Sequence, residues 1–114
     1  MKIHIKNDDI INIKNSCIEV TAKNKKYTFD KSEIEEISII TNNLGPFNDD
    51  MGLTIKINKS AGFFKKFTIF IMSENPLFEK ILFDELKEIA DIDYDAVTQA
   101  MSCVENKEFV LYKQ

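Results

Sequence analysis

Side chains suited to nucleophilic chemistry are few and scattered along this chain. The only histidine is His4, near the N-terminus, and the only cysteines are Cys17 and Cys103. Nucleophilic catalysis needs a hydroxyl or thiol beside a base that a third group orients, and neither cysteine has such a neighbour in sequence. Three glycines in the whole chain are too few for a phosphate-binding glycine loop. We therefore expect a protein that is not an enzyme.

Two groups of aspartates could supply carboxylate oxygens as ligands to a metal ion. The stretch Asp91-Ile92-Asp93-Tyr94-Asp95 is similar to the start of a calcium-binding loop, which needs glycine at its sixth position and glutamate at its twelfth. Those positions hold Ala96 and Ser102, so the match fails and helix capping by Asp91 or Asp93 is expected instead. The pair Asp49-Asp50 would need further ligands from elsewhere. We predict no metal and no other cofactor.

Composition indicates an ordinary globular protein. A chain of 114 residues, 44% hydrophobic and 30% charged, is expected to form one domain over residues 1–114. Its net charge of −4 argues against nucleic acid as the main partner. No run is long and apolar enough for a transmembrane segment, and the alternating N-terminus is not that of a signal peptide. With no export signal and two cysteines, a cytoplasmic protein with reduced thiols is predicted.

Alternating apolar residues predict short strands joined by polar turns. The first strands are expected at 3–5, 11–13, 18–22 and 27–29, and later ones at 37–41, 53–57 and 67–72. The last of these is apolar on both faces, which predicts a central or covered strand. The chain closes with Phe109 to Tyr112, a final strand or a packed tail.

Helical signals interrupt this pattern at three places. Ser32 and Glu35 match a capping box, with Ile34 and Ile37 on one face of a helical turn. Further on, Asn75 before Pro76 predicts the start of a long amphipathic helix that ends near residue 90. A second, shorter helix, capped by Asp91 or Asp93, is expected to carry Val97, Ala100, Met101 and Val104. The fold class is thus α+β, a strongly bent antiparallel sheet of about six to seven strands followed by one long and one short C-terminal helix. A pleckstrin-homology-like barrel and an open α+β sandwich both fit this order.

The longest break between strands is the loop from Thr41 to Gly52. Gly45 allows a tight reversal and Pro46 restrains the backbone after it. Phe47 follows directly and stands next to the carboxylates of Asp49 and Asp50. Two interpretations are open, a connection whose Phe47 packs back into the core, and a recognition loop.

This loop also carries a family resemblance. The run Thr41 to Asp50, with Gly45-Pro46-Phe47, resembles the Thr-x-Asp-x-Gly-Pro-Phe-x-x-Asp segment of a family of small uncharacterised bacterial proteins. Asp93 to Met101 resembles its Phe-Asp-x-x-x-Val-x-x-Ala-Met segment, and Asn106 to Tyr112 its closing Asn-x-x-Phe-x-x-Trp. Ile92 replaces the aromatic residue before Asp93, and the tryptophans are absent. The resemblance implies that the loop and the second helix define the fold, and implies no activity.

The leading functional hypothesis is a non-enzymatic immunity protein that binds and neutralises a cognate bacterial toxin, for example a basic nuclease, because the chain is small and acidic. The predicted contact residues are Glu33, Glu35, Glu36, Asp49 and Asp50, with Phe47 or Tyr94 as anchors. The alternative is a pleckstrin-like adaptor that binds a peptide or an anionic lipid through lysine-bearing hairpins. Its lysines are Lys23, Lys25, Lys26, Lys59, Lys65 and Lys66, which are equally typical of solvated residues that protect strand edges.

Overall fold

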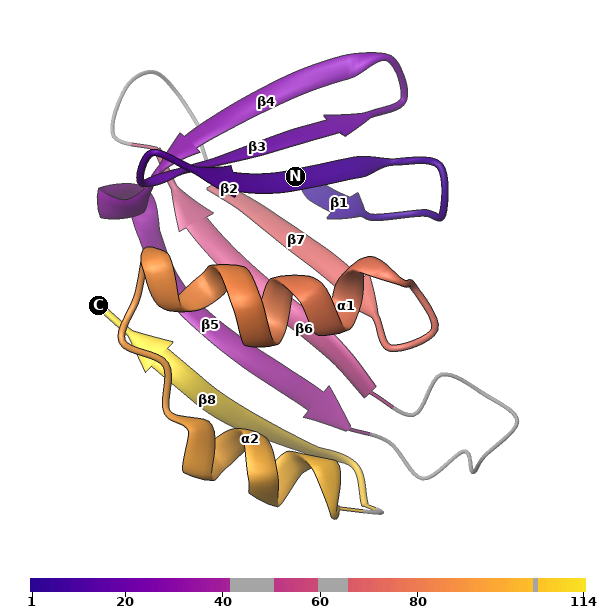
Figure 1. Cartoon of the computed structure of the whole chain (residues 1–114), viewed down its shortest axis with the longest axis vertical. Coiled ribbons are helices and arrows are strands. Elements are labelled where there is room, and N and C mark those ends of the chain that lie inside the picture. The colour runs from indigo at the N-terminus through magenta and orange to yellow at the C-terminus, as the bar shows by residue number, and fades with distance from the viewer. Residues whose placement is uncertain (42–50, 60–65, 104) are drawn as a thin grey trace.

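The computed structural model describes residues 1–41, 51–59, 66–103 and 105–114. In these residues the strands form two sheets (Figure 1), a five-stranded one in the order β1-β7-β6-β5-β8 and a three-stranded one in the order β2-β3-β4. The strand β1 runs parallel to β7, and all other neighbours are antiparallel. The bounds are β1 Lys2–His4, β2 Ile10–Lys14, β3 Cys17–Ala22, β4 Lys25–Asp30, β5 Ile34–Thr41, β6 Met51–Asn58, β7 Lys66–Met72 and β8 Lys107–Lys113.

The long helical segment begins where the sequence predicts. It comprises α1 (Leu77–Glu79), the wider π-type turns of η2 (Lys80–Glu85) and the tight turn η3 (Leu86–Glu88). The Asn75 side chain accepts a hydrogen bond of 2.9 Å from the Leu77 N–H, which satisfies a donor at the start of the helix. The shorter helix α2 (Tyr94–Met101) is capped by Asp93, whose side chain accepts from the Ala96 N–H at 3.1 Å. Both predicted caps are confirmed.

The three-stranded sheet is built from two tight hairpins without glycine. Lys14 pairs with Cys17 and Ala22 pairs with Lys25, so each turn has only two residues. The φ angles are 53° and 65° at Asn15 and Ser16, and 53° and 63° at Lys23 and Asn24. Positive φ at both central positions is the mark of a type I′ turn, whose twist matches that of the strands it joins.

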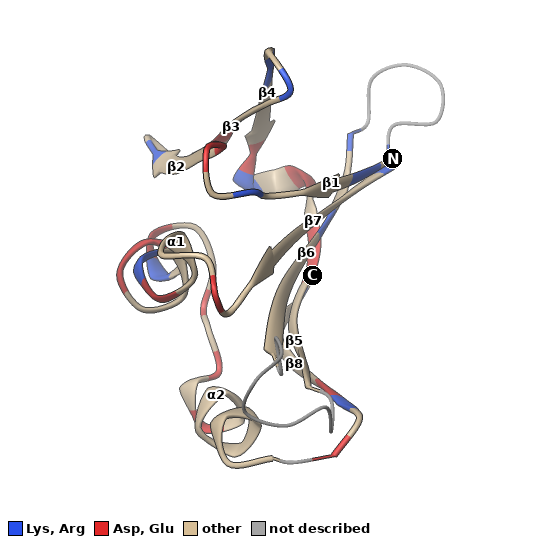
Figure 2. Ribbon diagram, turned by 90° about the vertical axis from the view of Figure 1, so that its right-hand side faces the viewer, with Lys and Arg blue, Asp and Glu red and all other residues tan. Residues whose placement is uncertain are grey.

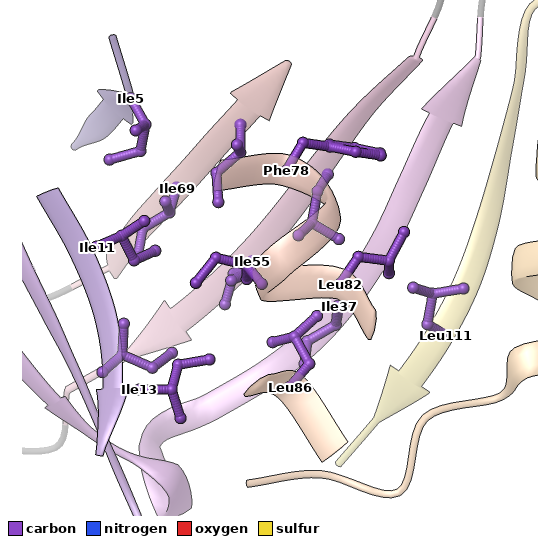
Figure 3. Packing of buried hydrophobic residues seen from close by; sticks show 14 of the residues in the cluster. Ile5, Ile11, Ile13, Ile37, Ile55, Ile69, Phe78, Leu82, Leu86 and Leu111 are labelled. Carbon is purple, nitrogen blue, oxygen red and sulfur yellow. The ribbon is translucent and has the colours of Figure 1, made fainter. Parts of the chain in front are cut away.

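One hydrophobic core joins both sheets to the helices. Phe78, Leu82 and Leu86 of the long helical segment are buried against the five-stranded sheet, and Figure 3 shows Leu82 and Leu86 beside Ile37 of β5. From the other side of the cluster, β2 contributes further buried isoleucines, shown as Ile11 and Ile13 in the same view. The three-stranded sheet therefore closes the core over the helix-bearing face of the larger sheet.

The predicted α+β class with one long and one short helix is confirmed, but a single antiparallel sheet of six or seven strands is wrong. The described residues form eight strands in two sheets, with one parallel pair. The final strand, β8, follows both helices and pairs with β5, so the helices are not the end of the fold. Sequence periodicity identifies strands but carries no information about which of them pair, which explains the error.

The predicted capping box at Ser32 and Glu35 is also wrong. The box lies two residues earlier: Asp30 accepts from the Ser32 N–H at 3.0 Å, and the Asp30 N–H donates to the Glu33 carboxylate at 2.8 Å. It caps the short turn η1 (Lys31–Glu33). Ile34 and Ile37 are both buried because a β-bulge follows Ile34 in its pairing with β6. The bulge inserts an extra residue, and this produces a three-residue spacing that imitates a helix.

Candidate protein-binding surface

The five-stranded sheet has two unequal faces. Figure 2 shows α1 and α2 on one side of the strands, and in the described part of the chain no helix lies against the opposite side of β5, β6 and β8. Because side chains alternate between the faces, register identifies the residues on this uncovered side, here called the open face. They are Lys2 and His4 (β1), Thr68, Phe70 and Met72 (β7), Gly52, Thr54 and Lys56 (β6), Glu36, Ser38 and Ile40 (β5), and Glu108, Val110 and Lys113 (β8).

The centre of the open face is polar and sheltered. Ser38 pairs with Thr54 across β5 and β6, and these residues are only 0% and 2% exposed. Among the described residues, neither Ser38 Oγ nor Thr54 Oγ1 has a hydrogen-bond partner. A buried hydroxyl without a partner costs about 1–3 kcal/mol, so this pair is a place where an added donor or acceptor would be stabilising.

Larger apolar side chains flank these hydroxyls. Ile40 and Val110 remain 39% and 40% exposed, and Phe70 and Met72 on β7 are half-buried. Gly52 lies between the two groups, and a Cβ atom there would be 3.0 Å from Met72 Sδ. The missing side chain at residue 52 therefore lets Met72 lie across β6. The result is an apolar margin around a small polar centre, with partly exposed apolar side chains that a protein partner could cover.

One end of the open face is charged. Lys56 Nζ lies 2.9 Å from Glu36 Oε2, and this hydrogen bond raises the pKa of Lys56, against the opposing effect of burial. Glu35 joins them, with Lys113 and Gln114, around an open hollow of about 400 Å³. The Gln114 N–H donates to the Glu35 carbonyl at 2.9 Å and so holds the end of the chain against β5.

The structure places the predicted contact residues in different surroundings. Glu33 belongs to the cap of η1, where its carboxylate accepts from the Asp30 N–H. Glu36 is engaged by Lys56, and Glu35 is half-buried beside it in sequence. Tyr94 is 38% exposed but begins α2, on the helix-bearing side of the sheet (Figure 2). The remaining three, Phe47, Asp49 and Asp50, lie outside the described residues.

The cysteine thiols, which could act as nucleophiles or metal ligands, have surroundings that suit a structural role. Cys17 and Cys103 are both free thiols, and Thr41 Oγ1, 3.6 Å from Cys103 Sγ, donates to the Glu105 carbonyl at 2.6 Å. Across the described ranges, no three His, Cys, Asp or Glu side chains come close enough together to hold a metal ion. In the same ranges, no helix has the length and apolar character that crossing a membrane requires.

Sequence reasoning missed the centre of the open face. Ser38 and Thr54 are ordinary polar residues in strands, and their alternation with buried isoleucines was the available signal. That signal indicates a face pointing away from the core; it does not indicate that neighbouring side chains shelter the hydroxyls. The prediction that 67–72 forms a central or covered strand is confirmed, because β7 lies between β1 and β6 in the five-stranded sheet.

Comparison of the chain with models of protein families, with curated proteins and with solved structures finds no match. The resemblance to the bacterial family with the Gly-Pro-Phe segment therefore stays a prediction. A functional proposal has to rest on the geometry of the open face and on the charge of the chain.

Proposed function

We propose that this protein is a non-enzymatic binding protein, an immunity protein that binds and neutralises a cognate bacterial toxin in the cytoplasm, and that the open face is its contact surface. The observation that carries the proposal is the Ser38–Thr54 pair, two buried hydroxyls without partners. Both hydroxyls are fully sheltered, so a partner would satisfy them by displacing the flanking side chains of Ile40 and Phe70 and inserting a hydrogen-bonding group. The same insertion would cover apolar surface, which provides affinity, while the hydroxyls provide specificity.

Charge favours a basic partner. The chain carries a net charge of −4, and a negatively charged protein associates faster with a positively charged one than with a neutral one. Within this proposal Glu35 and Glu36 extend the contact at the charged end of the open face. Asp49 and Asp50, which stand near Phe47 in the sequence, lie outside the described residues and stay sequence-based candidates for the contact. A basic nuclease is a toxin with the required charge.

Co-expression with the product of the neighbouring gene tests the proposal. The informative variant is Ile40→Asp, which places a charge beside Ser38 on the open face. The matched control is Ile10→Asp, because Ile10 is also an exposed strand isoleucine, 54% exposed, and lies on β2 in the other sheet. We expect co-purification and protection of cells by the unmodified protein and by Ile10→Asp, and loss of both with Ile40→Asp.

Two results would contradict this assignment. If the unmodified protein neither co-purifies with the neighbouring product nor protects cells, the immunity function is wrong. If it protects and Ile40→Asp protects equally well, the function stands but the contact surface lies elsewhere. Thermal unfolding of both variants shows whether each is folded before binding is compared.

A pleckstrin-homology-like adaptor is the second candidate. It is favoured by the exposure of Lys25 and Lys26, which follow the type I′ turn of the β3–β4 hairpin. Lys59 offers less support, because its Nζ donates to the Thr28 carbonyl at 3.1 Å and lies 5.3 Å from the Phe29 ring centre. Sedimentation with anionic liposomes separates the candidates, since an adaptor of this type binds them in a salt-sensitive way and an immunity protein does not require them.

A further inference from the structure

A cavity of about 260 Å³ lies where β1 meets the β3–β4 hairpin. Its apolar lining consists of Ile3, Ala22 and Tyr27. Ile3 and Ala22 are 6% and 7% exposed, and the Tyr27 ring packs edge-on against Phe67 with their centres 6.0 Å apart. The base of the cavity is therefore held by the same core that joins the two sheets.

Its remaining lining is cationic. Lys2 and Lys6 come from β1 and the turn that follows, and Lys23 comes from the tip of the hairpin. His4 also lines the cavity, together with Met1. Among the described residues that line it, none carries a carboxylate. The nearest carboxylate that a hydrogen bond ties to this lining is that of Asp9, which accepts from the Lys6 N–H at 2.9 Å. Three lysines against this one carboxylate leave an excess of positive charge at the cavity, and apolar walls strengthen its effect.

The strand β1 adds backbone donors to these charges. Among the described strands, β1 lies at the edge of its sheet and pairs with β7 alone. The Met1 carbonyl accepts from the Thr68 N–H, and the Ile5 N–H donates to the Phe70 carbonyl, both at 2.9 Å. Because backbone groups alternate in direction along a strand, the N–H groups of Lys2 and His4 point toward its free edge. The cavity lies on that side, since no described residue of β7 lines it.

The histidine is held in place by a ring contact. His4 stacks on Phe70 with ring centres 4.7 Å apart and an angle of 10° between the planes. This contact restricts the imidazole to the end of the cavity nearest the open face, where a ring N–H can donate to a ligand. A fixed donor costs less entropy on binding than a mobile lysine does.

The geometry points to a binding site for a compact phosphate-bearing anion. Lysine ammonium groups and free backbone N–H groups are donors that phosphate oxygens accept, and an apolar base with Tyr27 suits the group that carries the phosphate. The volume is below the roughly 300–1,000 Å³ of sites for drug-sized ligands, so the occupant is small. This site does not depend on toxin binding, because it needs only the cavity and its lysines.

Titration with inorganic phosphate and pyrophosphate, followed by NMR of the His4 and Tyr27 rings and by calorimetry, tests the proposal. The site variant is the double substitution Lys2→Gln and Lys6→Gln. Its control is Lys25→Gln with Lys26→Gln, which removes the same charge from exposed positions of the hairpin that do not line the cavity. We expect saturable, salt-sensitive binding of pyrophosphate, weakened about tenfold or more by the site variant and less than about twofold by the control.

Three results would overturn the site. The first is absence of saturable binding by either anion, and the second is an equal loss in both double variants, which indicates only a diffuse charge effect. The third is binding to phosphatidylserine vesicles without binding to the soluble anions, which indicates a membrane surface and not an enclosed site. If the site variant does not fold by circular dichroism, Lys6→Gln alone replaces it, since Lys6 lies in an exposed turn.

Discussion

Ser38 and Thr54 face each other from neighbouring strands, and both hydroxyls are buried without a hydrogen-bond partner. Thr41, three residues further along β5, provides the contrast: it is equally buried, at 2% exposure, and its hydroxyl donates to the Glu105 carbonyl at 2.6 Å. Buried hydroxyls on the two opposite faces of one strand thus differ, since Thr41 has a partner and Ser38 has none among the described residues. The unpartnered pair lowers the stability of the free protein, and under the proposed function a bound protein would offset that loss.

Replacing Thr54 by valine removes the unpaired hydroxyl and retains its shape. We expect Thr54→Val to leave the free energy of unfolding unchanged or to raise it by up to about 1 kcal/mol, since no hydrogen bond is lost. Denaturation in urea measures this. Binding of the proposed partner should weaken, because the partner's own polar group would then be buried without a hydroxyl to bond.

Thr41→Val is the matched control for that substitution. Here the Glu105 carbonyl loses its donor, so we expect destabilisation by about 1–2 kcal/mol. An equal loss of stability in Thr41→Val and Thr54→Val would mean that the Thr54 hydroxyl is satisfied in solution, and the open face would lose its main support.

Glu85 links the long helical segment to the edge of the three-stranded sheet. Its Oε1 accepts a hydrogen bond from the Ile13 N–H at 3.0 Å. Its Oε2 forms an ion pair with Lys80, whose Nζ lies 3.5 Å away, but the two atoms do not have hydrogen-bond geometry. We expect Glu85→Ala to destabilise the protein by about 1–3 kcal/mol, because it leaves a partly buried backbone donor unpaired. Glu85→Gln keeps an acceptor and should lose less; chemical denaturation of the two variants compares them. A larger loss with Gln than with Ala would show that the Ile13 contact is unimportant.

The lowered pKa of Asp30 is expected to make the stability of the folded protein depend on pH. The hydrogen bond from the Ser32 hydroxyl, 2.6 Å long, is the largest of the causes that hold the pKa of Asp30 below its ordinary value of 3.8. Because the pKa is lowered in the folded state, the contribution to stability is complete above pH 3.8 and is lost as the pH falls through the folded value. We expect Ser32→Ala to raise this pKa, as measured by NMR titration of the carboxyl carbon. Ser102→Ala, at the far end of α2, should not move it, and an unchanged value in Ser32→Ala would refute the assigned cause.

A substitution in the turn between β2 and β3 is expected to raise the stability of the folded protein. Ser16 has a φ of 65°, which is unfavourable for a residue with a side chain and accessible to glycine. Ser16→Gly creates the Asn-Gly pair that type I′ turns prefer, so we expect stabilisation by about 0.5–1 kcal/mol in thermal unfolding. Ser102→Gly is the control, since its φ is −100° and its hydroxyl bonds to the Thr98 and Gln99 carbonyls. It should destabilise, and a loss in both variants would contradict the turn argument.

Local chemistry made several elements predictable from the sequence. The caps at Asn75 and Asp93 depend on side chains within two or three residues of the bonds they form, so their pattern is visible in the chain itself. The short strands of the three-stranded sheet are predictable for the same reason, because the alternation of apolar and polar residues is a local property of the sequence. The α+β class follows from the order of these elements.

Contacts between distant residues decided the rest. The pairing of β8 with β5 and the parallel pairing of β1 with β7 join segments far apart in sequence, and no local pattern encodes them. The bulge after Ile34 misled sequence reasoning because an inserted residue and a helical turn produce the same three-residue spacing.

Residue types and their local order were enough to predict the α+β class, the helix caps and the acidic net charge of −4. The candidate sites became visible only in the folded chain. Ser38 and Thr54 become a sheltered polar centre because two strands place them opposite each other, and Lys2, Lys6 and Lys23 become one cationic cavity because a hairpin reaches the free edge of β1. Burial and proximity are properties of the packed chain, and a linear pattern of residue types does not contain them.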